Sequence, residues 1–402
     1  MSGFAARTSA ATGVHDPLLV QAVVVGDTAV VSVDVIGLHE EDCATIRARC
    51  PLPEDRVVVH ATHTHGGPVS MRGRLGHPRD ELWWDRVVDA CADAVAEARR
   101  TQVPVTIRAG YAPAPGVARN RRRPGGPVDH ALPVVRLERE GGAALATVVS
   151  YACHPVVLGA DNTLITADYP GVLRRRVGEA TGAPVLFLTG CAGDANTGHT
   201  AAASISTTPT PDRTFKECER VGTVIADAVL RAELGRSTGH VDARSSDVAL
   251  AYDVAGYDAL GSDLATWRAQ RRTADPATVA LLTTWIDWAA RQHEPAPEPC
   301  PVRVTVLRWG PAVVVTLPGE PFAAAAHAAR EAVERTSPGV VALVAGYSNG
   351  CPGYLPPREE YDAGGYEVTD AHRYYGSPGP FMPGSLELLL GSVERLLAET
   401  SP

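Results

Sequence analysis

Short runs of β-branched and aliphatic residues recur along the chain, and they constrain its fold more than any other feature. They predict strands at residues 19–25, 29–35, 56–60, 104–109, 144–150, 184–188, 302–307, 312–317 and 340–344. Several of these runs are apolar at every position, which is typical of strands that are covered on both faces. The sequence therefore predicts a sheet core that is buried between other layers.

Segments with helical periodicity lie between these strands. In residues 81–100, for example, Trp84, Val88, Cys91 and Val95 fall along one stripe of a helix. Similar patterns occupy residues 169–179, 216–233, 276–291, 322–334 and 385–399. Strands that alternate with helices predict an α/β fold with a mixed β-sheet core and covering helices.

The expected domain organisation follows from the length and from breaks in these patterns. A chain of 402 residues, of which 45% are hydrophobic, can bury a large core. The breaks are a Ser-, Thr- and Pro-rich stretch at 201–212 and the segment QHEPAPEPCP at 292–301. Chemical motifs occur on both sides of them and no internal repeat is found. We therefore expect one domain over residues 1–402, with an insertion or lid around 201–300.

Charge and cysteine content exclude several classes of protein. A net charge of −9 gives no basic surface for a nucleic-acid backbone, so we expect no nucleic-acid partner. The eight cysteines form no C-x-x-C pair and are too sparse for a disulfide scaffold, which favours reduced thiols and a cytoplasmic location. No signal-peptide pattern and no long apolar run occur, so we expect no membrane partner. A homo-oligomer is compatible with the sequence.

Histidines and a glutamate follow three of the predicted strands. His63 and His65 lie in HATHTHGGP, His154 lies in SYACHP, and Glu320 lies in TLPGEPF. Taken singly, they can be loop histidines, a core histidine and a carboxylate that complements a helix dipole. Together at strand exits, imidazoles and a carboxylate are the composition of a catalytic zinc site with room for water. His63 and His65 either both face this site or divide the roles of metal ligand and general base.

A glycine-rich turn, LTGCAGDANTG, follows the strand at 184–188. Its backbone N–H groups and the amide of Asn196 can donate hydrogen bonds to a developing negative charge. A tight turn with no chemical role is the alternative interpretation. The turn lacks the Gly-Lys-Ser/Thr ending of a phosphate-binding loop, so phosphate binding is not predicted.

Other hydrolase architectures fit the sequence less well. Residues 346–350 match the G-x-S-x-G elbow of serine hydrolases, with Ser348 followed by an aspartate and then by His372. That elbow requires a helix directly after the serine, whereas Pro352 and other prolines follow. A metallo-β-lactamase site needs an aspartate where this chain has Gly67, and a barrel amidohydrolase needs eight regular βα units.

A series of segments carries a further signal through its order along the chain. The segments are DPLLVQAVVV, VVSVDVIGL, HATHTHGGP, ARNRR, SYACHPVVLGADNTLITADYPG, LFLTGCAGDAN, TLPGEPF and GYLPPREEYDAGGYE. Each is unspecific alone, but together they resemble the catalytic domain of the neutral/alkaline, non-lysosomal ceramidase family over nearly the whole chain. The resemblance implies the fold of that catalytic domain.

The resemblance also implies a zinc ion and the residues that hold it. The ligands would be His63, His154, Glu320 and the tyrosine that opens YLPPREEY, Tyr354. Composition and spacing do not indicate that Tyr354 binds a metal, and only the resemblance assigns it that role. A phenol can bind as phenolate because a divalent cation favours the ionised form.

Further residues would line the site and take part in the reaction. His65 would act as base or position the water, while Arg121 and Tyr366 would hold the oxyanion of the scissile carbonyl. Asn196 stands where the family has the serine of its GDxSP turn, because this chain reads GDANT. A carboxamide can donate a hydrogen bond but forms no acyl-enzyme, so we expect direct attack by water.

Two other departures from the family concern the ends of the chain and bear on the substrate. The usual opening strand is missing or shortened ahead of Gly3, and the immunoglobulin-like C-terminal domain is absent. Aromatic residues make up only 5% of the chain and no basic amphipathic helix is present, so we expect a substrate smaller than ceramide. The predicted function is zinc-dependent hydrolysis of a small acylated amide or ester. The alternatives are a zinc Lewis acid for cyclisation, lyase or acyl-transfer chemistry in biosynthesis, and a catalytically silent binding protein.

Overall fold

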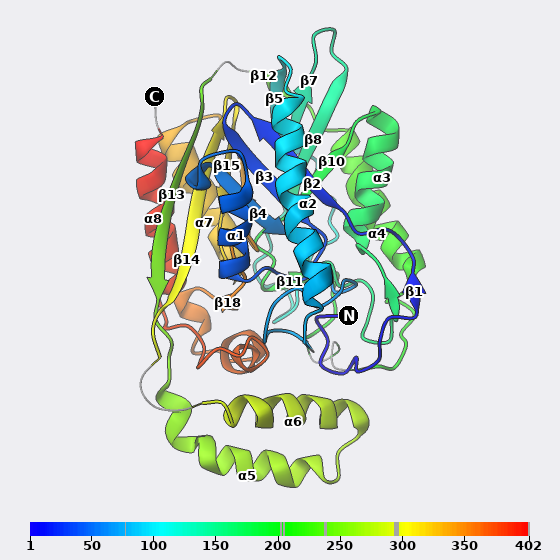
Figure 1. The fold of residues 1–402 in the computed structure, drawn as a ribbon, viewed down its shortest axis with the longest axis vertical. Coiled ribbons are helices and arrows are strands. Elements are labelled where there is room, and N and C mark those ends of the chain that lie inside the picture. The colour runs from blue at the N-terminus through cyan, green and yellow to red at the C-terminus, as the bar shows by residue number, and fades with distance from the viewer. Residues whose placement is uncertain (77, 202, 204–205, 237–238, 293–296, 401–402) are drawn as a thin grey trace.

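The computed structural model describes residues 1–402 except 77, 202, 204–205, 237–238, 293–296 and 401–402. A three-stranded, a five-stranded and a four-stranded sheet form its centre (Figure 1). The three-stranded sheet has the order β2-β3-β4 and consists of β2 (Val20–Val25), β3 (Thr28–Val33) and β4 (Val57–Ala61). β3 reads TAVVSV and β4 reads VVVHA, and these valine-rich strands are buried at every position.

The other two sheets have the orders β10-β8-β7-β5-β12 and β13-β14-β15-β17. Their strands are β5 (Thr106–Ala112), β7 (Leu132–Glu138), β8 (Ala144–Tyr151), β10 (Val185–Thr189), β12 (Gly235–Arg236), β13 (Val241–Leu250), β14 (Cys300–Trp309), β15 (Ala312–Thr316) and β17 (Val341–Ala345). Each sheet joins a parallel pair, namely β3/β4, β8/β10 or β15/β17, to antiparallel neighbours. All three sheets are therefore mixed.

Helices cover the outer face of each sheet (Figure 1). α1 (Glu40–Arg49) and α2 (Glu81–Arg100) pack on the three-stranded sheet. α3 (Tyr169–Thr181) and α4 (Phe215–Leu230) pack on the five-stranded sheet, and α7 (Ala323–Thr336) and α8 (Ser385–Glu399) pack on the four-stranded sheet. Several helices begin at a capping side chain: the Asp80 carboxylate, for example, accepts from the Trp83 N–H at the start of α2.

The inner faces of the three sheets share one hydrophobic cluster. It contains Val30 from the three-stranded sheet, Val135 and Val148 from the five-stranded sheet, and Val314 and Leu343 from the four-stranded sheet, all completely buried. With helices outside and this cluster inside, the central strands are covered on both faces. The predicted α/β fold with a mixed sheet core and covering helices is confirmed.

Several elements were not predicted from the sequence. They include the strands β7 and β13 and the helices α1 and α5 (Leu260–Arg271). β13 lies at the edge of its sheet and reads VDARSSDVAL, so its polar residues hide the strand pattern. α5 forms a hairpin with α6 (Pro276–Ala289), which packs on it through Trp267, Leu282 and Ile286, below the sheets in Figure 1.

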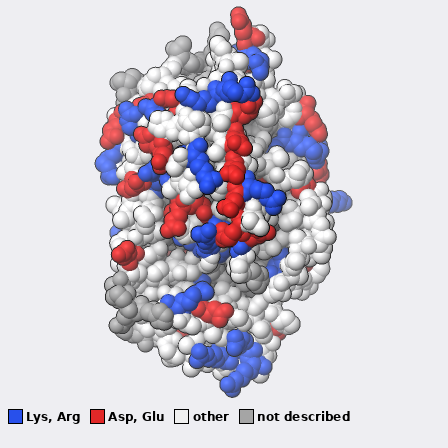
Figure 2. Space-filling model, in the orientation of Figure 1, with Lys and Arg blue, Asp and Glu red and all other residues white. Residues whose placement is uncertain are grey.

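Charged side chains of both signs are intermixed over the face that carries α1 and α2 (Figure 2). Basic side chains gather at the bottom of the same view, over the hairpin of α5 and α6. All eight cysteines are buried and form no disulfide, as the sequence predicts. Within the described residues, no helix combines the length and apolar character needed to cross a membrane.

Candidate metal centre and cavity

Side chains that follow three strands converge on one point. His63 follows β4, His154 follows β8, and Glu320 opens the short strand β16 (Glu320–Pro321) after β15. His154 Nε2 lies 3.0 Å from His63 Nε2 and 2.9 Å from Glu320 Oε2. His63 Nε2 lies 3.3 Å from the same carboxylate oxygen, and all three side chains are buried. Three of the residues predicted as metal ligands thus lie together.

Backbone carbonyls orient the imidazoles of His63 and His154. His63 Nδ1 lies 2.5 Å from Ile36 O, and His154 Nδ1 lies 2.6 Å from Ala192 O. Because a carbonyl oxygen only accepts, each Nδ1 carries the hydrogen and each Nε2 presents a lone pair. Lone pairs and a carboxylate this close repel one another unless a cation lies among them. The donor set fits Zn²⁺, whose nitrogen and oxygen ligands lie about 2.0–2.2 Å from the ion.

His65 adds another imidazole to this cluster. Its Nε2 lies 3.3 Å from His63 Nε2, and the ligand nitrogens of His63, His65 and His154 all lie within 4.8 Å of one another. Burial lowers the pKa of His65 well below its ordinary value, and the neighbouring imidazoles lower it further. The ring of His65 is therefore neutral. The Cys351 thiol lies within the same distance of His63 and Glu320, although a lone cysteine offers no sequence pattern that could have selected it.

Two tyrosines contact the carboxylate of Glu320. The Tyr375 hydroxyl donates to Oε1, and the Tyr347 hydroxyl lies 3.4 Å from Oε2. Burial alone would raise the pKa of Glu320, but its close contacts with the imidazoles of His63 and His154 hold it well below its ordinary value. The carboxylate is therefore ionised. Sequence reasoning missed both tyrosines, since they reach Glu320 only through the tertiary structure.

The backbone is strained beside this carboxylate. His63 has a φ of 64° and Tyr347 a φ of 52°, both in the left-handed region. The two rings lie against each other, with centroids 4.2 Å apart. A bulky residue in this conformation costs on the order of 1–3 kcal/mol and persists where its surroundings fix it, as at functional sites.

Tyr354 lies beside Glu320 in a short parallel pair of strands. β18 (Tyr354–Leu355) pairs with β16, and the register places Tyr354 opposite Glu320. The guanidinium of Arg121 donates to the Tyr354 hydroxyl oxygen at 2.9 Å. Burial raises the pKa of Tyr354 well above its ordinary value, although Arg121 opposes this shift. Loss of the phenolic proton therefore requires further positive charge next to the oxygen.

Arg121 is fixed by buried partners. Its Nε donates to Glu367 Oε1 at 2.8 Å, and one terminal nitrogen donates to Gly193 O at 2.8 Å. Arg122 binds the other oxygen of Glu367 at 2.7 Å. Burial alone would lower the pKa of Arg121, but Tyr354 and Glu367 raise it well above its ordinary value. The guanidinium is thus a permanently charged and immobile donor.

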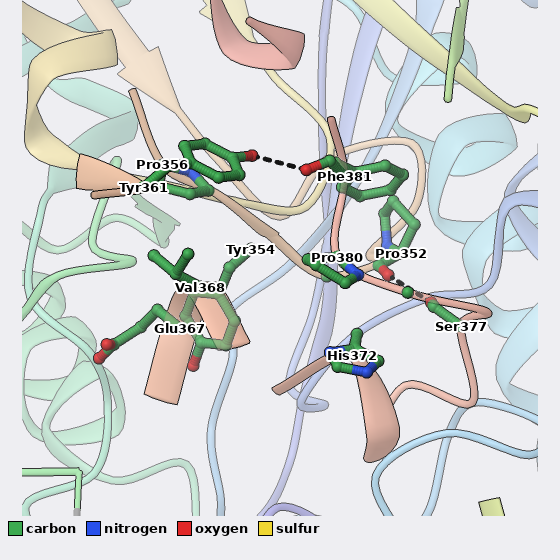
Figure 3. Close-up of a pocket in the computed structure, with 12 residues that line it drawn as sticks. Pro352, Tyr354, Pro356, Tyr361, Glu367, Val368, His372, Ser377, Pro380 and Phe381 are labelled. Carbon is green, nitrogen blue, oxygen red and sulfur yellow. Dashed lines mark hydrogen bonds between the residues drawn. The ribbon is translucent and has the colours of Figure 1, made fainter. Parts of the chain in front are cut away.

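Tyr366 lies next to Tyr354. Its ring centroid lies 5.8 Å from that of Tyr354 in an edge-on arrangement. Burial raises the pKa of Tyr366 well above its ordinary value, so its hydroxyl remains a hydrogen-bond donor. Figure 3 shows Tyr354 beside Glu367 and, farther along, Ser377, whose hydroxyl donates to Pro352 O at 3.3 Å.

Asn196 lies in the turn after β10. Its Nδ2 donates to His199 O at 2.8 Å, and its Oδ1 accepts from the Gly198 N–H at 2.7 Å. The pairing of β11 (Ala195–Asn196) with β6 (Arg119–Asn120) holds this turn next to Arg121. The amide therefore closes its own turn, and its role as an oxyanion donor stays a prediction.

A cavity of about 810 Å³ lies beside the cluster, and its lining includes His65 but not His63, His154 or Glu320. His65, Arg121, Tyr354 and Tyr366 contribute to its lining. Further lining residues come from residues 1–8, which we call the N-terminal strap, and from α6. The residues predicted to act on a substrate thus border a volume that can hold one, except that Asn196 is not among them.

The helix α6 is held at both ends of its path along this cavity. Near its start, Ala277 packs against the small cluster that contains Phe4 of the N-terminal strap. Near its end, the guanidinium of Arg373 lies 4.4 Å from the ring centroid of Trp285 and 5.7 Å from that of Trp288. The Trp288 indole N–H also donates to Ser377 O at 2.7 Å. These contacts make α6 one wall of the cavity.

The G-x-S-x-G segment does not form a nucleophile elbow. Ser348 is completely buried, donates to Gly346 O at 2.8 Å and lies 3.0 Å from His60 Nδ1. His372 instead packs on Trp288, with ring centroids 5.0 Å apart. Ser348 is also absent from the lining of the cavity, so it cannot reach a substrate there.

His60 should make the folded protein sensitive to acid. Burial lowers its pKa from 6.5 to about 3. Because the folded-state pKa lies below the unfolded one, the contribution of His60 to stability is present above pH 6.5 and is lost as the pH falls toward 3. At pH 5 this loss amounts to about 2 kcal/mol.

Denaturant unfolding of the wild type and of His60→Gln, each at about pH 8 and pH 5, measures this effect. His199 and His372, whose pKa values burial also lowers to about 3, titrate in both proteins. The wild type should therefore lose about 2 kcal/mol more than the variant. Equal losses would contradict the prediction.

Fold and cluster together define an α/β protein with a buried His-His-Glu centre of the kind that binds a divalent metal. Comparison with solved structures shows that this fold is that of the neutral ceramidases. The crystal structure of neutral ceramidase from Pseudomonas aeruginosa superposes with a TM-score of 0.70 at 18% sequence identity, covering 93% of this chain and 67% of that one. The structure of a ceramidase complexed with C2 superposes with a TM-score of 0.74 at 17% identity, covering 100% of this chain and 73% of that one.

Sequence comparisons alone do not reveal this relationship. No protein-family model matches the chain, and no curated protein matches it. The neutral ceramidase-like fold predicted from the order of the sequence segments is nevertheless confirmed by the structure.

Proposed function

We propose that this protein is a zinc-dependent hydrolase that cleaves the amide or ester bond of a compact acylated substrate. The observation that carries the proposal is the cluster of His63, His154 and Glu320, whose Nε2 lone pairs and ionised carboxylate face one another beside a cavity. Tyr354, opposite Glu320 in the strand register, is the proposed fourth ligand. A zinc ion bound there would supply Lewis acidity and a water of lowered pKa.

The remaining residues of the site divide the other tasks. His65, whose pKa burial lowers, is neutral and can accept the proton of the attacking water. Arg121 carries a fixed positive charge and Tyr366 a protonated hydroxyl, so both can donate to the oxyanion that forms at the carbonyl. Asn196, from the neighbouring turn, is the proposed additional donor. In this scheme no side chain becomes acylated.

The size of the cavity supports a compact substrate. Its volume of about 810 Å³ lies in the range of pockets that enclose drug-sized ligands. The wall that α6 contributes contains Ala280, Thr283 and Thr284, which are small or polar rather than suited to long alkyl chains. We further propose that the hairpin of α5 and α6, within the region expected to be an insertion, serves as the lid of this cavity.

Short acyl amines should be better substrates than long-chain ceramide. We expect the two long chains of ceramide to fit this cavity poorly, so kcat/KM for a short N-acyl amine should be higher by about a hundredfold or more. The measurement compares purified protein on a series of N-acyl amines and esters and on micellar ceramide.

Chelator-treated protein, with and without added zinc, is the control for metal dependence. Turnover should disappear with the chelator and return with zinc. A preference for ceramide would overturn the compact-substrate proposal. Absence of hydrolysis on every substrate, with cyclised or transferred acyl products instead, would favour the Lewis-acid alternative.

A further inference from the structure

The N-terminal strap lies directly against His65, and its closest point is Gly3. A Cβ atom on Gly3 would lie 2.5 Å from His65 Nδ1 and 2.5 Å from Ile36 Cδ1. Gly3 also has a φ of +99°, which other residues rarely adopt. The isoleucine methyl group can move aside, but the imidazole can do so only by rotating. Only glycine therefore allows the strap and the ring to occupy their present positions.

Two other residues of the strap contact His65. The ring centroid of Phe4 lies 4.9 Å from that of the imidazole. The Arg7 guanidinium donates to His65 O at 2.7 Å and to Gly159 O at 3.0 Å, which ties the strap to the loop after β8. The strap thus contacts the ring of His65 from two residues and its backbone from a third.

His65 differs from the other histidines of the cluster in how its ring nitrogen Nδ1 is held. The Nδ1 atoms of His63 and His154 are held by backbone carbonyls. His65 Nδ1 is buried and has no hydrogen-bond partner among the described residues. Within the described structure, the orientation of this ring is therefore set by van der Waals contact with the strap rather than by a hydrogen bond to Nδ1.

We infer that Gly3 is a positioning residue, through which the N-terminal strap holds the imidazole of His65 in the orientation that proton transfer requires. This inference rests on the proposed function, in which His65 is the base. A general base must lie within hydrogen-bond reach of the proton that it removes, so a rotated ring loses rate even when the metal ligands are intact.

The test is Gly3→Ala. Turnover should fall roughly 10- to 100-fold, as for other changes that misplace a catalytic group, while KM and zinc content stay near wild type. Gly116→Ala is the matched control, because Gly116 has a φ of +65° with no atom within 4 Å of an added Cβ. It introduces a similar backbone strain without a clash and should keep wild-type turnover.

A double-mutant cycle shows whether Gly3 acts through His65. In a His65→Ala background, Gly3→Ala should cause no further loss of turnover, because the ring that it displaces is gone. Phe4→Leu, a milder change of the same strap, should behave in the same way and replaces Gly3→Ala if that variant fails to fold. A loss of equal size in both backgrounds, or a loss of zinc, would overturn the inference.

Nuclear magnetic resonance of nitrogen-labelled histidines gives a readout that needs no activity. Gly3→Ala should shift the ring signals of His65, and Gly116→Ala should leave them unchanged. Unshifted signals in Gly3→Ala would overturn the inference. Full turnover in His65→Ala would instead overturn the role of His65 as base in the proposed function, so the two failures are distinguishable.

Discussion

Replacing His154 with alanine should remove most of the bound zinc and lower turnover by roughly a thousandfold or more, since metal catalysis supplies several kcal/mol. His154 Nε2 is 3.0 Å from His63 Nε2 and 2.9 Å from Glu320 Oε2, so its loss takes a central donor from the cluster. The hydroxyl of Tyr375 still donates to the carboxylate of Glu320 in this variant, so the change acts mainly on the metal site. Elemental analysis and turnover of the purified variant measure both effects.

The matched control is His327→Ala. His327 is exposed on α7 and lies outside the cluster, so this variant should keep its zinc and its turnover. Undiminished zinc in His154→Ala would remove His154 from the metal site. Loss of zinc in both variants would indicate binding to surface histidines instead.

Two tyrosines that share a wall of the cavity should fail in different ways when their hydroxyls are removed. Tyr354→Phe should weaken zinc binding, because Tyr354 lies opposite Glu320 and is the proposed ligand. Tyr366→Phe should keep zinc and lose roughly a hundred- to a thousandfold in turnover, the usual loss for one oxyanion donor. Zinc content and turnover of the two variants, measured in parallel, separate the two roles.

The surroundings of Arg121 make this comparison interpretable. Arg121 donates to the Tyr354 hydroxyl but is also held by Glu367 and by Gly193 O, so Tyr354→Phe should leave the guanidinium in place. Arg121→Ala should resemble Tyr366→Phe, with zinc retained and turnover lost. Equal zinc loss in all three variants would contradict the division into ligand and oxyanion donors.

The sequence predicts the fold well where burial dictates residue type. Strands such as β3 and β15 are covered on both faces, an environment that favours apolar residues and gives a recognisable valine-rich run. It fails for β13, an edge strand with polar residues, and for α5, which packs on a single helix and so has a weak apolar stripe.

The residues of the candidate site could also be predicted only in part. His63, His154 and Glu320 could be found because each follows the end of a buried strand, and the ends of β4, β8 and β15, one from each sheet, lie together. Tyr354 could be named only through the family resemblance. Tyr375, which binds Glu320 from 55 residues farther along the chain, has no sequence pattern of its own, because its contact depends on how loops pack over the cluster.

The position of the cluster also links metal supply to folding. His63 and His154 are separated by 91 residues, and Glu320 follows much later, so an ion bound by all three would cross-link distant parts of the chain. An unfolded chain offers no such preformed site, and binding free energy is therefore gained only on folding. At free zinc a hundred times above its Kd, the folded state would gain about 2.7 kcal/mol. The thermal midpoint of this protein should accordingly rise with free zinc, in addition to the stability that the hydrophobic clusters of the core supply.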